Sequence, residues 1–288
     1  YFQPDGSYNE EVGYAYYTAQ HLQQSAVSMA LHTKENQNDI INWDGYIDFN
    51  LNMSIPTHQD PNSLVNFGDS GRRPGNPRKF SQTALPFWIA SVTRKPLAQW
   101  YAENLGGAHT FWSVIWHDAT VKTKPPEQGP QLWISDLDRV VARTGFTVDD
   151  LVVAMRSGPP SNHEHADRNS SIVKCYGEIL VADPIRPPYS FSDPSWRLRL
   201  TEGHSAVLVD GRGHEHHNGV EGTNPSRSFA RITHQISSKR HAQWTSDATQ
   251  PYRLVDTDIK KVVRTMVVLY DEPAVVVIDR LSKYKNTS

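Results

Sequence analysis

The chain has 288 residues, of which 38% are hydrophobic and 21% are charged, and its formal net charge is −2. A chain of this length forms one large domain or two ordinary ones, and its charge balance excludes a globally basic protein of the kind that binds nucleic acid or a membrane surface. No run of about 18 apolar residues occurs, so the sequence predicts no membrane-spanning helix.

The first half of the chain has the composition of helices joined by loops. Residues 11–32 are rich in Ala, Gln, Tyr and Leu and lack Gly and Pro after Gly13, which predicts one long helix. Shorter helices are predicted at residues 38–54, 81–93 and 96–105, and residues 109–117 form a further apolar segment. Residues 55–78 are punctuated by Pro, Gly, Asn and Asp and are predicted to form a long loop, a feature that is usually functional or disordered.

After a Pro-containing linker at residues 123–131, the spacing of the hydrophobic residues changes to the pattern typical of β-strands. β-Branched runs separated by turn residues occupy residues 148–156, 170–180, 205–210, 229–236, 260–270 and 274–281. Such runs without helices between them predict an antiparallel β-sandwich. We therefore expect an α+β chain with a helical part at residues 1–150 and a sandwich at residues 151–288. Since the chain ends directly after a predicted strand, we also expect an internal portion of a longer protein.

The string at residues 161–167, Ser-Asn-His-Glu-His-Ala-Asp, is the most informative part of the sequence. In an extended strand, side chains two residues apart share a face, so His163, His165 and Asp167 would project together. Two imidazoles at this spacing can serve one metal ion, or one can bind the metal while the other transfers protons. A pair of hydrogen-bonded or solvated loop histidines is the alternative interpretation.

Two further residues at the ends of predicted strands can complete a metal site. Asp183 closes the stretch at residues 177–182, and His204 precedes the stretch at residues 205–210. Together with His165 they provide nitrogen, oxygen and nitrogen donors, a set that suits zinc. Ligands from successive strand ends can meet in space, so this set is a candidate zinc site.

Two segments of the helical half carry other candidates. Near the start, an Asp-Gly pair predicts a turn ahead of a helix, and Tyr14 lies in the first turns of that helix, where a tyrosine is more often part of the core than catalytic. In the loop at residues 71–79, Arg72 and Arg73 are followed by two further cations. The planar guanidinium of arginine can form paired hydrogen bonds with a carboxylate or a sulfate, so this loop can be a clamp that binds an acidic substrate. The alternative is a simple solvated loop.

Taken in order, three segments resemble the heparinase II/III-like superfamily of polysaccharide lyases. They are residues 5–14 (from Asp-Gly-Ser-Tyr-Asn-Glu to Tyr14), residues 162–167 (Asn-His-Glu-His-Ala-Asp), and residues 177–183 followed by 204–211. The resemblance implies an incomplete α/α toroid packed on an antiparallel β-sandwich, with an acidic polysaccharide bound between them. It also implies β-elimination next to a uronate carboxylate, by a protein that is secreted or periplasmic.

The same resemblance implies roles for individual residues. Tyr14 is similar in position to the family's catalytic tyrosine, and His163 to its catalytic histidine. His165, Asp183 and His204 are similar to the ligands of a zinc ion that is usually structural. The family's first catalytic Asn or His lies upstream of the tyrosine and has no counterpart in this sequence.

Elimination requires that the proton at C5 of the uronate becomes more acidic. Neutralising the adjacent carboxylate stabilises the charge that develops there, and Asn162 and Arg156 are the candidates for this task. A base then takes the proton and an acid protonates the leaving oxygen, and Tyr14 and His163 can exchange these roles with the stereochemistry of the uronate. Tyr189, in a Pro-Pro-Tyr string, is a further active-site candidate.

Three functions are compatible with these residues. The leading hypothesis is a lyase acting on an alginate-like, unsulfated polymer, since only one dense basic loop is visible, although heparan-type glycosaminoglycans also fit. A metal-dependent hydrolase is the second, because residues 163–167 are similar to the metallo-β-lactamase motif, which however needs His where Arg168 stands. A glycan-binding protein with a degenerate site is the third. We expect no nucleic acid and no membrane as partners, and the sequence does not predict an oligomeric state.

Overall fold

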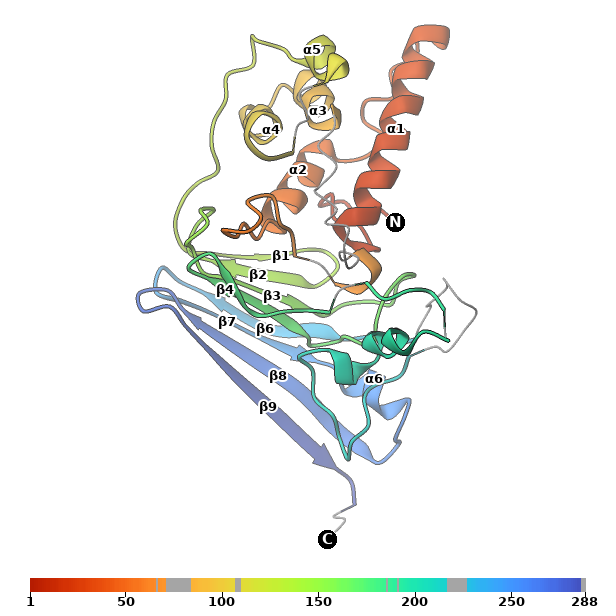
Figure 1. Ribbon diagram of the computed structural model, residues 1–288, viewed down its shortest axis with the longest axis vertical. Helices are drawn as coiled ribbons and strands as arrows, with labels where there is room; N and C mark the ends of the chain where they lie inside the picture. The colour runs from red at the N-terminus through yellow and green to blue at the C-terminus, as the bar shows by residue number, and fades with distance from the viewer. Residues whose placement is uncertain are drawn as a thin grey trace.

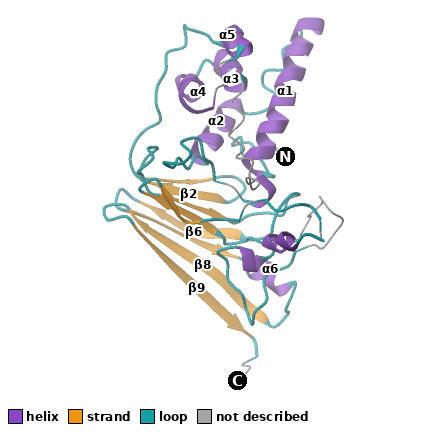
Figure 2. Cartoon of the chain, in the orientation of Figure 1, coloured by secondary structure: helices purple, strands orange, loops and turns teal. Residues whose placement is uncertain are grey.

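Helices come first along the chain and two antiparallel sheets follow them (Figure 1, Figure 2). The computed structural model describes residues 1–65, 67–70, 84–106, 110–184, 186–190, 192–216 and 227–285. In Figure 1 the helices that precede the first sheet in the chain lie above it, and the second sheet lies below it. None of the described helices has the length and apolar character needed to cross a membrane.

The helical layer consists of α1 (Glu11–Thr33), α2 (Trp43–Asn52), α3 (Leu85–Thr93), α4 (Pro96–Tyr101), a π-helical turn (Ala102–Gly106) and α5 (Phe111–Trp116). Side chains cap the N-termini of two of these helices. Asn42 accepts a hydrogen bond from the Gly45 amide ahead of α2, and Thr110 and Ser113 form a capping box at α5. Each of the four stretches predicted to be helical overlaps one of these helices, so that prediction is confirmed, and α5 lies in the apolar segment at residues 109–117.

The first sheet has five strands in the order β1-β2-β3-β4-β5, and the second has four in the order β6-β7-β8-β9, all antiparallel to their neighbours. The first sheet contains β1 (Gln131–Ile134), β2 (Arg139–Arg143), β3 (Val152–Arg156), β4 (Ser171–Cys175) and β5 (Glu178–Val181). The second contains β6 (Arg231–Ser237), β7 (His241–Asp247), β8 (Ile259–Leu269) and β9 (Ala274–Lys283). Short helical turns occur at Gly68–Ser70, Pro194–Arg199, Thr201–Gly203 and α6 (Thr249–Arg253).

The two sheets pack face to face around a shared apolar core. Trp244 of β7 is fully buried there, and its indole donates a hydrogen bond to the sulfur of Met155 on β3 at 3.4 Å. Alternate residues of the first sheet, such as Val141 and Ala154, pack instead against the helices. Because side chains alternate along a strand, the first sheet is buried on both faces at its central strands β2, β3 and β4. It therefore forms the middle layer of the molecule.

Two predictions about the strands are wrong. Residues 205–210 form no strand, and within the described part of the chain they take part in one isolated bridge, between Val209 and Arg212. The single strand predicted at residues 170–180 is a hairpin, β4 and β5, because Tyr176 and Gly177 turn the chain with φ of 50° and 75°.

The sequence also missed three strands, β1, β2 and β7, whose residues mix polar and apolar types. β2 begins and ends with an arginine, and both arginines are fully buried. Since β1 and β2 precede residue 151, the boundary predicted between residues 150 and 151 falls inside the first sheet.

Candidate active site

The phenol of Tyr14 and the imidazole of His163 meet where the helical layer joins the first sheet. Tyr14 lies near the start of α1, and His163 lies in the loop between β3 and β4. Tyr14 Oη is 3.3 Å from His163 Nδ1, and the two rings stack with centroids 4.3 Å apart and planes inclined by 16°. Both residues are half-buried. The structure therefore brings together the two residues singled out as catalytic candidates.

The backbone of His163 is held in an uncommon conformation. Its φ is 57°, in the left-handed region that side chains other than glycine rarely adopt. The Asp69 amide donates a hydrogen bond to the His163 carbonyl at 2.9 Å. Gly68 makes this approach possible, since a Cβ at that position would lie 2.6 Å from the same carbonyl oxygen. A turn from the helical half thus fixes the loop that carries His163.

Tyr189 is the third member of the cluster. Its hydroxyl lies 2.8 Å from Tyr14 Oη and 3.1 Å from His163 Nδ1. Burial raises the pKa of Tyr189 well above its ordinary value, and the negative charge of Asp69 adds to the effect, so this phenol stays protonated. The guanidinium of Arg186 lies 4.7 Å from the centre of the Tyr189 ring. The structure thus places this predicted candidate beside the other two.

Asp69 joins the cluster to the histidine two residues further on. Its carboxylate lies 3.2 Å from His163 Nδ1 through one oxygen and 3.1 Å from His165 Nε2 through the other, and it also accepts a hydrogen bond from Arg199. Burial alone would raise the pKa of Asp69, but the hydrogen bonds with the two histidines and the nearby positive charge hold it well below its usual range. Nothing in the sequence marked this residue beyond its place in the long loop predicted at residues 55–78.

His165, Asp183 and His204 form a compact buried set, as the sequence predicted. One donor atom from each lies within 4.8 Å of the others. His165 Nδ1, Asp183 Oδ2 and His204 Nε2 are buried and have no hydrogen-bond partner among the described residues. Buried polar atoms without partners are rare, and these three donors are of the kinds that bind a metal ion such as zinc, so the set fits a metal site.

The remaining atoms of the set are fixed by the protein. His165 Nε2 faces Asp69, and His204 Nδ1 lies 2.8 Å from an oxygen of Asp183. Such contacts hold the rings of metal-binding histidines in one orientation and one tautomer. Burial also lowers the pKa of His165, which favours the neutral imidazole that metal binding requires.

The expectation of an extended strand at residues 161–167 is wrong, because this segment is a loop. His163 and His165 still converge, but on Asp69 rather than on one strand face. The carboxylate of Asp167 faces the guanidinium groups of Arg156 and Arg168 at 2.9 and 3.4 Å. Its charge is therefore neutralised by arginines, and the arrangement does not support the hydrolase motif.

Arg156 is not available to a substrate, so that prediction is wrong. The residue is fully buried, and its guanidinium is paired with Glu11, Glu164 and Asp167. Asn162 lies half-exposed beside His163, where a role in substrate binding stays a prediction. The other two predicted substrate-binding residues, Arg72 and Arg73, lie outside the described residues.

Arg186 is a candidate that the sequence analysis missed. It is 9% exposed, and its Nε atom has no hydrogen-bond partner among the residues that the structure describes. No carboxylate of the described residues forms an ion pair with the Arg186 guanidinium. Because burying an unpaired charge is costly, this guanidinium beside Tyr189 is suited to binding an anionic ligand.

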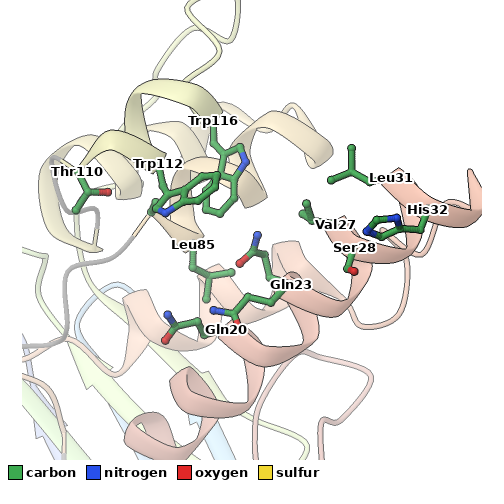
Figure 3. Close-up of a pocket in the computed structure, with 12 residues that line it drawn as sticks. Gln20, Gln23, Val27, Ser28, Leu31, His32, Leu85, Thr110, Trp112 and Trp116 are labelled. Carbon is green, nitrogen blue, oxygen red and sulfur yellow. The ribbon is translucent and has the colours of Figure 1, made fainter.

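A separate cavity of about 460 Å³ lies between α1 and α5 (Figure 3). Glutamines such as Gln23 and the stacked rings of Trp112 and Trp116 line it, and neither Tyr14 nor His163 does. This cavity therefore belongs to the helical layer alone.

Comparison with known proteins gives a family match and several similar structures. Residues 136–288 match the family described as heparinase II/III-like, C-terminal. Among solved structures, the chain is similar to a mutant of the heparan sulfate lyase HepC from Pedobacter heparinus, with 17% identity and a TM-score of 0.66. It is also similar to heparinase III, the BT4657 gene product with methylated lysines, with 14% identity and a TM-score of 0.68. Another heparinase III structure is similar with 12% identity and a TM-score of 0.68.

These structural matches cover 98%, 98% and 99% of this chain, but only 39%, 38% and 41% of the solved chains. The chain thus spans about two fifths of the length of those proteins. No curated protein sequence matches it. At such low identity the structural likeness establishes the fold alone.

Proposed function

The chain belongs to the heparinase II/III-like family, and on this basis we propose that it carries part of the active site of a polysaccharide lyase. The substrate is an acidic, uronate-containing polysaccharide, which the enzyme cleaves by β-elimination. The observation that carries the proposal is the 3.3 Å approach of Tyr14 Oη to His163 Nδ1. A phenol and an imidazole in contact can serve as the acid and the base of one elimination.

In the reaction, a base takes the proton from C5 of the uronate. The electrons of the broken C–H bond form the C4–C5 double bond, and the C4–O bond to the leaving sugar breaks. An acid gives its proton to the departing oxygen. His163 is the base and Tyr14 the acid for one C5 epimer, and Tyr14 takes both roles in turn for the other.

The uronate carboxylate must be neutralised for this proton to leave. Arg186 replaces Arg156 in that role, because it is unpaired in the described part of the chain and lies over the ring of Tyr189. Asn162, next to His163, supplies a hydrogen bond to the same carboxylate. Hydrogen-bond donors of this kind act on the charge that develops in the transition state.

His165, Asp183 and His204 hold a zinc ion in this proposal, supported by their unpartnered buried atoms. Bound zinc would cross-link the loop of His163 to the segments of Asp183 and His204, and it takes no part in proton transfer. Metal analysis of the purified protein tests this role, together with thermal unfolding before and after chelation. A chain free of zinc, or one whose unfolding temperature is unaffected by chelation, would contradict it.

The helices α1 to α5 form part of an α/α toroid in this proposal, and the protein is secreted or periplasmic like other proteins that act on extracellular polysaccharides. The preference for alginate rested on the loop of Arg72 and Arg73, which lies outside the described residues. One of the similar structures is that of a heparan sulfate lyase. We therefore assign the class of uronate polymer and no single member of it.

The proposal is tested by incubating the full-length protein with a panel of uronate polysaccharides, including alginate and heparan sulfate. Formation of an unsaturated uronate is followed by its ultraviolet absorbance. Tyr14→Phe and His163→Ala should each abolish this product. The matched control is Tyr17→Phe on the same helix, because Tyr17 is 63% exposed and this variant should keep full activity.

Two outcomes would overturn the proposal. One is full activity in the Tyr14→Phe and His163→Ala variants. The other is binding of acidic oligosaccharides by the wild-type protein without any turnover, which would make the chain a glycan-binding protein.

A further inference from the structure

We propose that Arg156 is a positioning residue that fixes Tyr14 of the helical layer against His163 of the sheet layer. This inference rests on the proposed lyase function and deepens it. It gives the buried arginine a role in place of substrate binding.

The contacts of Arg156 link the surroundings of the two reacting side chains. Its Nη1 lies 2.8 Å from the Glu11 carboxylate, and its Nη2 lies 3.0 Å from the Glu164 carboxylate. Glu11 lies three residues before Tyr14 at the start of α1, and Glu164 directly follows His163. One guanidinium therefore spans the gap between the helix of the phenol and the loop of the imidazole.

The linkage is fully buried and charged. The side chains of Arg156, Glu11 and Glu164 are 1%, 3% and 0% exposed. Arg139 stands opposite Arg156 in the register of β2 and β3, and it binds the same Glu11 oxygen at 2.5 Å. Two cations facing each other across strands repel, so Glu11 is needed between them. This requirement ties the start of α1 to one place on the sheet.

Stability alone does not explain such a network, because apolar side chains of similar volume often stabilise a core as well as buried ion pairs do. Ion pairs differ in being directional, and setting register is their best-attested use. The backbone of Glu11 has φ of 65°, a strained value, which its surroundings must maintain. The bound carboxylate therefore sets where α1 begins and how its first turn is rotated, and with it the direction of Tyr14.

Misplacing a reacting group by about 1 Å can slow a reaction by about a hundredfold. We call Arg156 and its carboxylate partners Glu11 and Glu164 the bridge. We therefore expect variants of the bridge to lower kcat while leaving KM nearly unchanged, because substrate binding does not involve these buried groups. Glu11→Gln keeps the shape of the side chain and removes its charge. Arg156→Lys keeps a charge but cannot reach several carboxylates at once.

The matched control is Arg143→Lys. Arg143 is also fully buried in the first sheet and also joins it to the helical half, by donating to the carbonyl oxygens of Asn52 and Ser54. It lies at the opposite end of β2 from Arg139 and does not contact the bridge. Loss of stability alone should affect this variant and Arg156→Lys alike.

The experiment combines kinetics with nuclear magnetic resonance of the His163 imidazole in the full-length protein. In Tyr14→Phe the Nδ1 resonance should shift, because its phenol partner is lost. In Glu11→Gln and Arg156→Lys, the Nδ1 resonance should shift in the same direction as in Tyr14→Phe. In both variants kcat should be about tenfold to hundredfold lower than in the wild-type protein, and KM should stay within about threefold of the wild-type value. Arg143→Lys should keep the wild-type resonance and kcat.

The proposal is overturned if Glu11→Gln retains both the wild-type kcat and the wild-type resonance. It is also overturned if Arg143→Lys loses as much kcat as the bridge variants at equal thermal stability. If the wild-type protein makes no unsaturated product, the lyase function fails instead, while the resonance of His163 still reports on the bridge.

Discussion

At the scale of the residue, the two nitrogens of His163 have different surroundings. Nδ1 lies within 3.3 Å of Tyr14 Oη, Tyr189 Oη and an oxygen of Asp69. Within the described part of the chain, Nε2 has no protein partner. The side chain is 19% exposed. The protein therefore orients the ring through Nδ1, and Nε2 is the nitrogen that we assign to the substrate.

Arg186 gives the first prediction at this scale. Replacing it with Met removes the cation that we assign to the uronate carboxylate. A hydrogen bond to a charged group contributes about 1.5–3 kcal/mol, so kcat/KM should fall about tenfold to hundredfold. The control is Arg197→Met, since the Arg197 side chain is 76% exposed and paired with Glu202 at the surface. Equal activity of the two variants on the cleaved polymer would refute the assignment.

The second prediction concerns acid stability. His214 accepts a hydrogen bond from the Arg168 amide through Nε2, and its Nδ1 faces the Glu215 carbonyl at 2.8 Å, so the buried ring is neutral. Burial lowers the pKa of His214 to about 3, and the charge of Arg168 adds to the effect. In the unfolded chain the pKa is about 6.5, so folding excludes a proton that the unfolded state binds.

His214 therefore contributes stability that is fully present above pH 6.5 and is lost as the pH falls toward 3. The slope is about 1.4 kcal/mol per pH unit. His214→Gln keeps an acceptor for the Arg168 amide and does not titrate. Urea unfolding at neutral and mildly acidic pH should show a smaller loss of unfolding free energy in this variant. An unchanged loss would show that another group is responsible.

Which site residues the sequence could predict depends on their spacing. His163 and His165 stand out because they lie two residues apart, and Asp183 and His204 because they border β-branched runs. Asp69 and Arg186 are single charged residues in loops, and only folding brings them to His163 and Tyr189. Arg156 was predicted to bind substrate because a sequence does not reveal that three carboxylates surround it.

At the scale of the element, the helices were easier to predict than the strands. The composition of residues 11–32 allows little except a helix. The half-polar strands β2 and β7 are stabilised by pairing and burial in the sheets, which are contacts between distant residues. The turn at Gly68–Ser70 had no signal of its own, although it supports the His163 loop.

That turn yields the third prediction. Gly68 has φ of 60°, and a Cβ there would lie 2.6 Å from the His163 carbonyl oxygen. Gly68→Ala therefore combines backbone strain with a clash that displaces His163. The matched control is Gly211→Ala, because Gly211 has φ of 72° and a Cβ added there would meet no described atom within 4 Å.

Backbone strain should destabilise both variants by about 1–2 kcal/mol. The clash should cost Gly68→Ala about 1–3 kcal/mol more and should reduce its activity, which Gly211→Ala should retain. Denaturant unfolding and the lyase assay measure both effects. Equal stability and equal activity of the two variants would refute a supporting role for this turn.

At the scale of the whole molecule, the first sheet separates the helices α1 to α5 from the second sheet and is covered by both (Figure 1). Its helix-facing side carries the buried cations Arg139, Arg143, Arg156 and Lys174. The candidate site exists only where the two layers meet, because Tyr14 and His163 are 149 residues apart in the chain. Local patterns can identify each layer, but they cannot establish this contact.

The most direct test of eliminative cleavage is digestion in water enriched in the heavy isotope of oxygen. Elimination breaks the C4–O bond without adding water, so mass spectrometry should show an unsaturated uronate at the new non-reducing end that does not carry the heavy isotope. Hydrolysis adds one water molecule to each cleaved bond. A saturated product that carries the heavy isotope would contradict elimination by Tyr14 and His163.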